Sequence, residues 1–89
     1  MPLIRFTPHL RRHVAVEDMW VEATTVSEAL EAVFALSPTA RSYLLDDSGA
    51  VRFHVAIFLD GQSITDRKAQ ADPVDPDSEI DVLQALSGG

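Results

Sequence analysis

The sequence predicts one small α+β domain. Two patterns predict it: stretches in which apolar and polar residues alternate, as in half-buried strands, flank a segment whose apolar residues recur at helical spacing. Size is the third observation, because 89 residues with a hydrophobic fraction of 46% suit a single folded unit built around one core.

The helix is predicted over residues 26–36. Residues 25–28, Thr-Val-Ser-Glu, have the form of a capping box, in which the Thr25 hydroxyl accepts from the Glu28 N–H and Glu28 reaches back to the Thr25 N–H. Apolar residues at 26, 29, 30 and 33 then follow the spacing of one helix face. Pro38 ends the helix, because a residue that precedes proline avoids the α conformation.

Four strands are predicted, at residues 3–6, 14–23, 51–59 and 80–86, which gives the order β-β-α-β-β. Residues 9–13 are expected to form a turn, and Asp60-Gly61 to form the loop that ends the third strand. Residues 38–50 are expected to be mostly irregular, with the apolar part of residues 43–45 on the core.

Charge and composition exclude several classes of function. Fourteen acidic and seven basic residues give a net charge of −7, which disfavours nucleic acid and anionic membranes as partners. The sequence has no cysteine, so it cannot form a disulfide, a thiolate metal site or a cysteine nucleophile. No apolar run has the length of a membrane span or of a secretory signal, so we expect a cytoplasmic protein.

The last residues of the sequence, Ser87-Gly88-Gly89, follow directly on the fourth predicted strand. Glycine has no Cβ, so such a segment can pass through a narrow slot. At about 3.3 Å per residue, residues 86–89 can reach roughly 13 Å beyond the sheet. We therefore expect a domain of residues 1–86 and a flexible tail of residues 87–89 that can carry its terminal carboxylate into a partner's active site. A frayed end without function is the alternative.

Four segments give the sequence a resemblance to a known family. Residues 82–89, Val-Leu-Gln-Ala-Leu-Ser-Gly-Gly, resemble the end of the ThiS/MoaD sulfur-carrier proteins, and residues 55–64 resemble their central strand and the turn after it. Residues 26–30 resemble the start of their helix, and residues 72–80 resemble the approach to their last strand, although Pro76-Asp77 stands where the family often has Gly-Asp. Leu10-Arg11 and residues 51–53 look most like the cysteine-biosynthesis carriers of this family.

The resemblance implies a ubiquitin-like β-grasp fold, with a mixed sheet of four or five strands packed on one main helix. It also implies a carrier without catalytic residues or a cofactor of its own. An E1-like adenylating enzyme, holding ATP and Mg²⁺, would adenylate Gly89, and a sulfur donor would convert the adenylate to a thiocarboxylate. That group would serve a sulfur-accepting enzyme in the synthesis of cysteine, molybdopterin or thiamine. Gly88 and Ser87 would thread the partner's channel.

Two other functions use the same tail. A ubiquitin-like modifier would join Gly89 to a partner's lysine, and Lys68 is the only lysine of this sequence. A small subunit of a complex similar to molybdopterin synthase would keep its tail inserted in a catalytic subunit.

A docking surface is expected on one face of the sheet. If residues 55, 57, 80 and 82 point into the core, strand alternation places Ala56, Phe58, Leu83 and Ala85 on the opposite face. An exposed phenylalanine and leucine on neighbouring strands form an apolar patch of the kind that often marks a protein interface.

No side-chain active site is predicted. His9 and His13 are expected on a turn without a third ligand, so they predict no metal site. Residues 72–81 hold five carboxylates, which predict a solvated loop or, alternatively, steering toward a basic partner. The two prolines and the lack of glycine in this segment argue against a Ca²⁺ loop.

Overall fold

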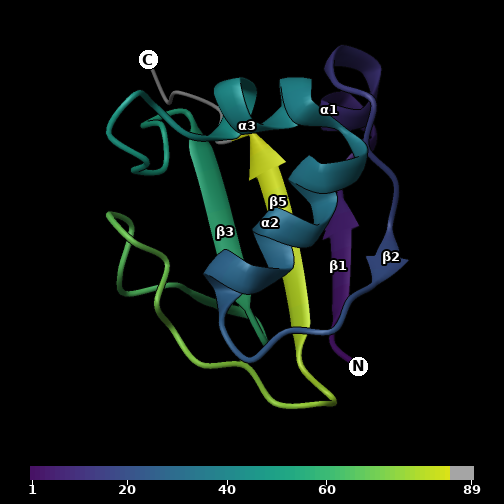
Figure 1. Cartoon of the computed structure of the whole chain (residues 1–89), viewed down its shortest axis with the longest axis vertical. Coiled ribbons are helices and arrows are strands. Elements are labelled where there is room, and N and C mark those ends of the chain that lie inside the picture. The colour runs from purple at the N-terminus through teal and green to yellow at the C-terminus, as the bar shows by residue number, and fades with distance from the viewer. Residues whose placement is uncertain (85–89) are drawn as a thin grey trace.

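The computed structural model describes residues 1–84 (Figure 1). Along this part of the chain lie, in order, β1 (Leu3–Phe6), α1 (Pro8–His13), β2 (Met19–Trp20), α2 (Val26–Leu36), α3 (Pro38–Leu44), β3 (Val55–Leu59), β4 (Gln62–Ser63) and β5 (Glu79–Gln84). The expected tail, residues 87–89, and the end of the fourth predicted strand lie outside the described residues.

The five strands form one mixed sheet in the order β2-β1-β5-β3-β4. The first long strand and the last are parallel neighbours, with Ile4 opposite Ile80 and Phe6 opposite Val82, whereas β5 pairs antiparallel with β3. The last strand of the chain therefore occupies the centre of the sheet, and both of its edges are hydrogen bonded.

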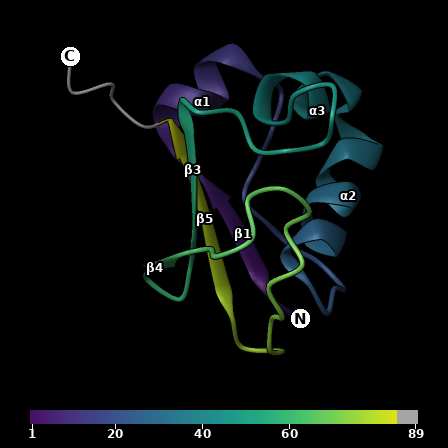
Figure 2. The ribbon, with the colours of Figure 1, turned by 90° about the vertical axis from the view of Figure 1, so that its left-hand side faces the viewer.

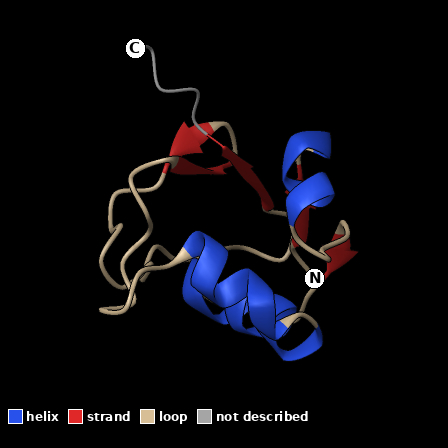
Figure 3. Cartoon of the chain, turned by 90° about the horizontal axis from the view of Figure 1, so that it is seen from above, coloured by secondary structure: helices blue, strands red, loops and turns tan. Residues whose placement is uncertain are grey.

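Helices α2 and α3 cover one face of this sheet, and α1 lies at the end where β1 and β5 finish (Figures 1 and 2). Seen from above, the opposite face of β3 and β5 carries no helix among the described residues (Figure 3). The core fills the space between the sheet and α2 and is almost fully withdrawn from water; its largest side chains are those of Ile4, Leu10, Leu30, Leu44, Ile57 and Ile80. The predicted α+β class, with one main helix on a mixed sheet, is confirmed.

Helix α2 begins and ends where the sequence predicts. Thr25 accepts the Glu28 N–H at 3.1 Å, as a capping box requires. The reciprocal bond differs from the prediction, because the Glu28 carboxylate accepts from the N–H and the hydroxyl of Thr24 instead of the Thr25 N–H. The strand-like bridge of Thr25 with Pro73 fixes the backbone just before the helix, through hydrogen bonds from Val26 N–H to the Asp72 carbonyl and from Val74 N–H to the Thr24 carbonyl.

Two predicted connections are helices. Residues 9–13 were expected to form a turn but belong to α1, and residues 38–50, expected to be irregular, contain α3. Both helices begin at a proline, Pro8 and Pro38, whose fixed φ suits the first helical position. The prediction used these prolines only as the ends of the preceding elements. The placement of residues 43–45 on the core is confirmed, because Leu44 and Leu45 are buried.

Two predicted strands are shorter than expected. Of residues 14–23 only Met19–Trp20 pair with β1; Val14, Val16 and Val21 are buried without strand pairing. The strand predicted over 51–59 begins at Val55, because a turn at residues 52–55 separates it from Val51. The Arg67 side chain fastens this turn by donating to the carbonyl oxygens of residues 51, 52 and 55.

Strand β4 was not predicted. Asp60 and Gly61 have φ values of +50° and +84°, and they join β3 to β4 as a two-residue hairpin turn. Positive φ at both central positions belongs to the type I′ turn, for which Asp-Gly is a preferred sequence. The sequence prediction of a loop at Asp60-Gly61 is therefore incomplete, because an Asp-Gly pair after a strand also favours a hairpin to a further strand.

Candidate functional site

The residues predicted to carry the chemistry lie at the end of the chain. Gly89, Gly88, Ser87 and Ala85 are outside the described residues, so their predicted roles remain predictions. What the structure does describe is the strand that leads to them, the sheet face beside it, and the side chains around Gln84, where the described part of β5 ends.

The other three predicted docking residues lie together on the helix-free face of the sheet. Ala56 and Leu83 are directly opposite each other on β3 and β5, and Phe58 is two residues further along β3. All three are half-buried, while their neighbours Ile57 and Val82 point into the core. The predicted division of β3 and β5 into a core face and an outer face is therefore correct, and the apolar part of the outer face adjoins the end of β5.

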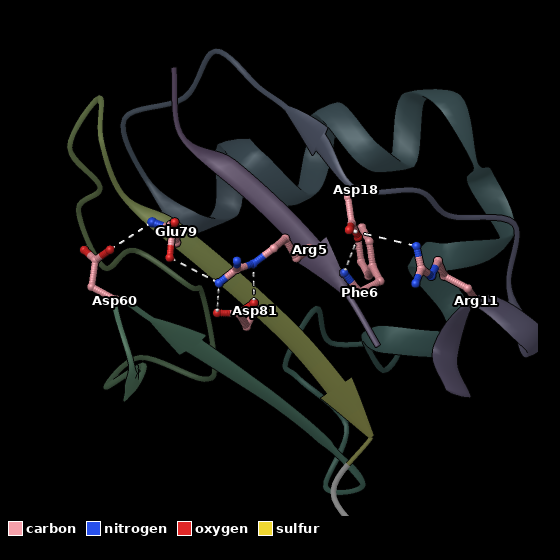
Figure 4. A network of polar contacts seen from close by, with 7 residues as sticks. All are labelled: Arg5, Phe6, Arg11, Asp18, Asp60, Glu79 and Asp81. Atoms are coloured by element: carbon pink, nitrogen blue, oxygen red, sulfur yellow. Dashed lines mark hydrogen bonds and ion pairs between the residues drawn. The ribbon is translucent and has the colours of Figure 1, made fainter. Parts of the chain in front are cut away.

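Beside the apolar patch, the outer face carries an ionic group (Figure 4). Arg5 on β1 lies opposite Asp81 on β5 and binds its carboxylate through two contacts, Nε to Oδ1 at 2.8 Å and an η nitrogen to Oδ2 at 3.1 Å. The same guanidinium contacts Glu79 at 3.1 Å. The hydrogen bond to Asp81 is the main reason that the pKa of Arg5 is raised. Arg5, Glu79 and Asp81 thus form a charged band beside the apolar patch, on the side away from Gln84.

Asp60 closes the far end of this band. Its carboxylate accepts the Glu79 N–H at 2.8 Å and the Ser78 hydroxyl at 3.1 Å, so the hairpin between β3 and β4 is tied to the start of β5 (Figure 4). On the other edge of the sheet, Asp18 accepts the Phe6 N–H at 2.8 Å and lies 3.9 Å from Arg11. These carboxylates hold strand ends in place and are not grouped around a common point.

Three of the five carboxylates of residues 72–81, those of Asp72, Glu79 and Asp81, have structural partners as well. Asp72 accepts the N–H groups of Thr65 and Asp66 and the Thr65 hydroxyl, and these hydrogen bonds lower its pKa. Asp66 accepts three N–H groups of residues 68–71, and its pKa is lowered for the same reason. Asp81 and Glu79 bind Arg5. This segment is therefore held by hydrogen bonds and ion pairs at both ends, while the exposed carboxylates of Asp75 and Asp77 accept no hydrogen bond among the described residues.

Side chains from α1 and α3 surround the end of β5. The Tyr43 hydroxyl donates to Gln84 Oε1 at 3.2 Å. His13 stacks on Tyr43 with 6.2 Å between ring centroids, and His9 lies 4.8 Å from His13. His9 and His13 thus share a helix, which the sequence reading did not expect, but no three candidate ligands converge on a metal position anywhere in residues 1–84.

A groove of about 510 Å³ lies between α1, the segment after it and the end of α2. Apolar side chains make most of its lining: Val14, Ala15, Val16, Met19, Val33 and Leu36. The buried hydroxyl of Ser37, which also lines the groove, has no hydrogen-bond partner among the described residues. Arg11 and Glu17 are the charged groups at the groove, and they do not form a nucleophile and base pair.

No helix in residues 1–84 combines the length and the apolar character needed to cross a membrane.

Comparison by sequence finds no matching family model and no matching curated protein. Comparison by structure does find matches. SAMP1 from Haloferax volcanii superposes with a TM-score of 0.79 at 19% identity, over 99% of this chain and 98% of that one.

A chain of the Amycolatopsis orientalis BexX/CysO complex matches with a TM-score of 0.82 at 14% identity over the whole of both chains. Urm1 from Sulfolobus solfataricus matches with a TM-score of 0.71 at 12% identity, over 93% of this chain and 99% of that one.

The chain has the ubiquitin-like β-grasp fold. This confirms the fold that the ThiS/MoaD resemblance of the sequence implied.

Proposed function

We propose that this β-grasp protein is a sulfur carrier whose Gly89 carboxylate is activated by an E1-like adenylating enzyme. A carboxylate oxygen of Gly89 attacks the α-phosphorus of ATP and expels pyrophosphate, which leaves an acyl-adenylate. Hydrosulfide-level sulfur from a donor then attacks the acyl carbon and expels AMP, so that a thiocarboxylate remains. ATP, Mg²⁺ and all catalytic side chains belong to the partner, and the cytoplasm supplies the nucleotide.

The position of β5 carries this proposal. The strand is central, is bonded along both edges and leads to a sequence that ends in Gly88-Gly89. Five residues follow Gln84, and at about 3.3 Å each they span at most roughly 17 Å. A firmly held strand with a short small-residue extension suits the delivery of a terminal group, because holding the reacting group near its target replaces a bimolecular encounter.

The similar structures support a role as carrier or modifier. Their names include a modifier protein and a component of a two-protein complex, BexX/CysO. We propose by analogy that this chain works with partner proteins: the adenylating enzyme, the sulfur donor and a sulfur-accepting biosynthetic enzyme. The CysO match agrees with the resemblance of residues 10–11 and 51–53 to the cysteine-biosynthesis carriers.

Deletion of Gly89 tests the proposal. We expect the truncated protein to lose adenylation and sulfur transfer while its melting temperature stays that of the wild type, because the described core ends at Gln84. Intact-mass spectrometry with a thiol-alkylating probe should find one terminal oxygen replaced by sulfur in the wild type only. The probe is needed because oxidation of Met1 or Met19 adds a similar mass. Sulfur transfer by the truncated chain would refute the carrier role.

A modifier function is the second candidate, and the likeness to SAMP1, a protein named as a small archaeal modifier, favours it. The same adenylate would then form an isopeptide bond with a partner's lysine. Denaturing electrophoresis of cell lysates would show covalent conjugates that disappear on deletion of Gly89. Lys68→Arg should remove any chain of copies linked through this protein, because Lys68 is its only lysine. A stable stoichiometric partner without conjugates would instead favour the small-subunit function.

A further inference from the structure

Five aromatic rings form a continuous series at the end of the molecule where the described part of β5 stops. Their centroids are separated by 4.8 Å from His9 to His13, 6.2 Å from His13 to Tyr43, 5.8 Å from Tyr43 to His54 and 5.6 Å from His54 to Phe53. We call this set the tail-side ring cluster. It includes all three histidines of the sequence, and its five rings come from three separate segments: α1, α3 and the turn before β3.

The cluster is in direct contact with the end of β5. Tyr43 donates to the side chain of Gln84, and Gln84 pairs with Val55, the residue after His54. Gly89 is only five positions after Gln84, so the terminal carboxylate lies within about 17 Å of Gln84 along the chain. Any protein that encloses Gly89 must therefore approach this end of the molecule.

Phe53 gives the cluster an apolar anchor. Its side chain is 90% exposed, the most exposed of the large hydrophobic residues described, and it stands in the turn that Arg67 fastens. An aromatic ring held in water by a rigid turn contributes little to the fold. Aromatic residues with arginine beside them are, by contrast, the side chains that most often dominate binding at protein interfaces.

Helix α1, which supplies two rings of the cluster, carries two arginines and no carboxylate, in a protein whose net charge is −7. Arg12 lies on α1 between His9 and His13, is exposed, and forms no ion pair among residues 1–84. The other arginines are engaged: Arg5 with Asp81 and Glu79, Arg11 with Asp18, Arg41 with Glu31, and Arg52 and Arg67 with main-chain carbonyls. An exposed arginine without an ion pair, on the helix that supplies two rings of the cluster, is complementary to an acidic protein surface.

We propose that the tail-side ring cluster and Arg12 are a second docking surface, separate from the apolar sheet patch. Its occupant is an acidic surface, with a pocket for Phe53, at the mouth of the site that receives Gly89. This proposal rests on the proposed function, because it assigns the cluster to the enzyme that activates the tail. The carboxylates of that surface pair with Arg12, and its pocket removes the Phe53 ring from water.

The test is pyrophosphate exchange into ATP by the adenylating enzyme of the same organism, with the full-length chain as the varied substrate. Phe53→Ala and Arg12→Glu should each raise the KM for the chain about tenfold and leave kcat unchanged. Raising the salt concentration should raise the wild-type KM but have less effect on the KM of Arg12→Glu. Melting temperatures confirm that each variant is folded.

Two variants serve as matched controls. Trp20→Ala removes an aromatic ring that is 65% exposed on β2, and Lys68→Glu reverses an exposed charge on the long loop. Both should keep the wild-type KM.

A wild-type KM in Phe53→Ala and Arg12→Glu, with normal exchange by the wild type, would overturn this inference and leave the proposed function standing. No exchange with the wild type would overturn both. A dimer of the chain that Phe53→Ala disrupts, with KM unchanged, would assign the cluster to self-association and also overturn the proposal.

Discussion

Tyr43 on α3 holds the side chain of Gln84 on β5, hydroxyl to Oε1, at 3.2 Å. The two residues are 41 positions apart, and no other side-chain hydrogen bond among the described residues links α3 to β5. The contact fastens the last described residue of the central strand to the helical layer. It therefore sets the point from which the remaining five residues start.

Removing this contact should loosen the end of β5 without unfolding the protein. Tyr43→Phe deletes only the hydroxyl, so we expect a loss of about 0.5–1.5 kcal/mol in the free energy of unfolding. Hydrogen exchange should become faster at the amides near Gln84 and stay unchanged in α2. Equal protection of these amides in both proteins would show that the main-chain ladder with β3 suffices to hold the strand.

The apolar sheet patch should matter for binding more than for folding. Leu83→Ser replaces a half-buried side chain beside Ala56, and we expect about a tenfold weaker affinity for the adenylating enzyme. Titration calorimetry measures the affinity, and a melting curve measures the cost to the fold. Gln62→Ser, on the exposed strand β4, is the control. Undiminished affinity in Leu83→Ser would remove this face from the interface.

Gly61 should be required for the hairpin between β3 and β4. Its φ of +84° strains any residue with a Cβ, although a Cβ built there meets no atom within 4 Å. Gly61→Ala should therefore cost about 1–2 kcal/mol, the penalty of the left-handed conformation. Gly61→Asn should recover part of this loss, because asparagine tolerates that conformation. Urea unfolding measures both variants, and an unchanged midpoint in Gly61→Ala would contradict the type I′ assignment.

Asp72 should make the stability depend on pH. Its folded pKa is lowered by the N–H groups of Thr65 and Asp66, so the stabilisation is present above the ordinary aspartate pKa of about 4. It is lost as the pH falls through the lower folded pKa. Asp72→Asn should be less stable than the wild type at pH 7, and this difference should shrink below pH 4.

Urea unfolding at pH 7, 5, 4 and 3 measures the dependence on Asp72. Asp77→Asn is the matched control, because the exposed Asp77 carboxylate accepts no hydrogen bond among the described residues. A constant difference between wild type and Asp72→Asn across this range would contradict the role given to the carboxylate.

Strong local signals allowed the sequence to predict the framework. The spacing of apolar residues in α2 and the alternation in β3 and β5 identify the elements that face the core. The strand predicted over residues 14–23 is wrong for most of its length, because buried valines occur in loops as well as in strands. The spacing of these valines does not show whether the backbone forms hydrogen bonds with a neighbouring strand. The sequence does not predict the short helices α1 and α3, because each has too few buried residues to show a helical repeat. The proline that begins each helix also indicates the end of the preceding element.

The site could be predicted only in part. Alternation in β3 and β5 is enough to place Ala56, Phe58 and Leu83 on one face. The tail-side ring cluster could not be predicted, because its five rings come from three segments that meet only through the tertiary fold. Pairing of an element as short as β2 or β4 likewise depends on its neighbours rather than on its own sequence.

The central place of β5 has a consequence for synthesis. Strand β5 is synthesised after β1 and β3 but lies between them in the sheet. A nascent chain without β5 therefore cannot connect the β2-β1 pair to the β3-β4 hairpin. Folding of the sheet must therefore wait until β5 has left the ribosome. An activating enzyme that recognises the assembled sheet would in this way ignore unfinished chains, and only completed molecules would be charged.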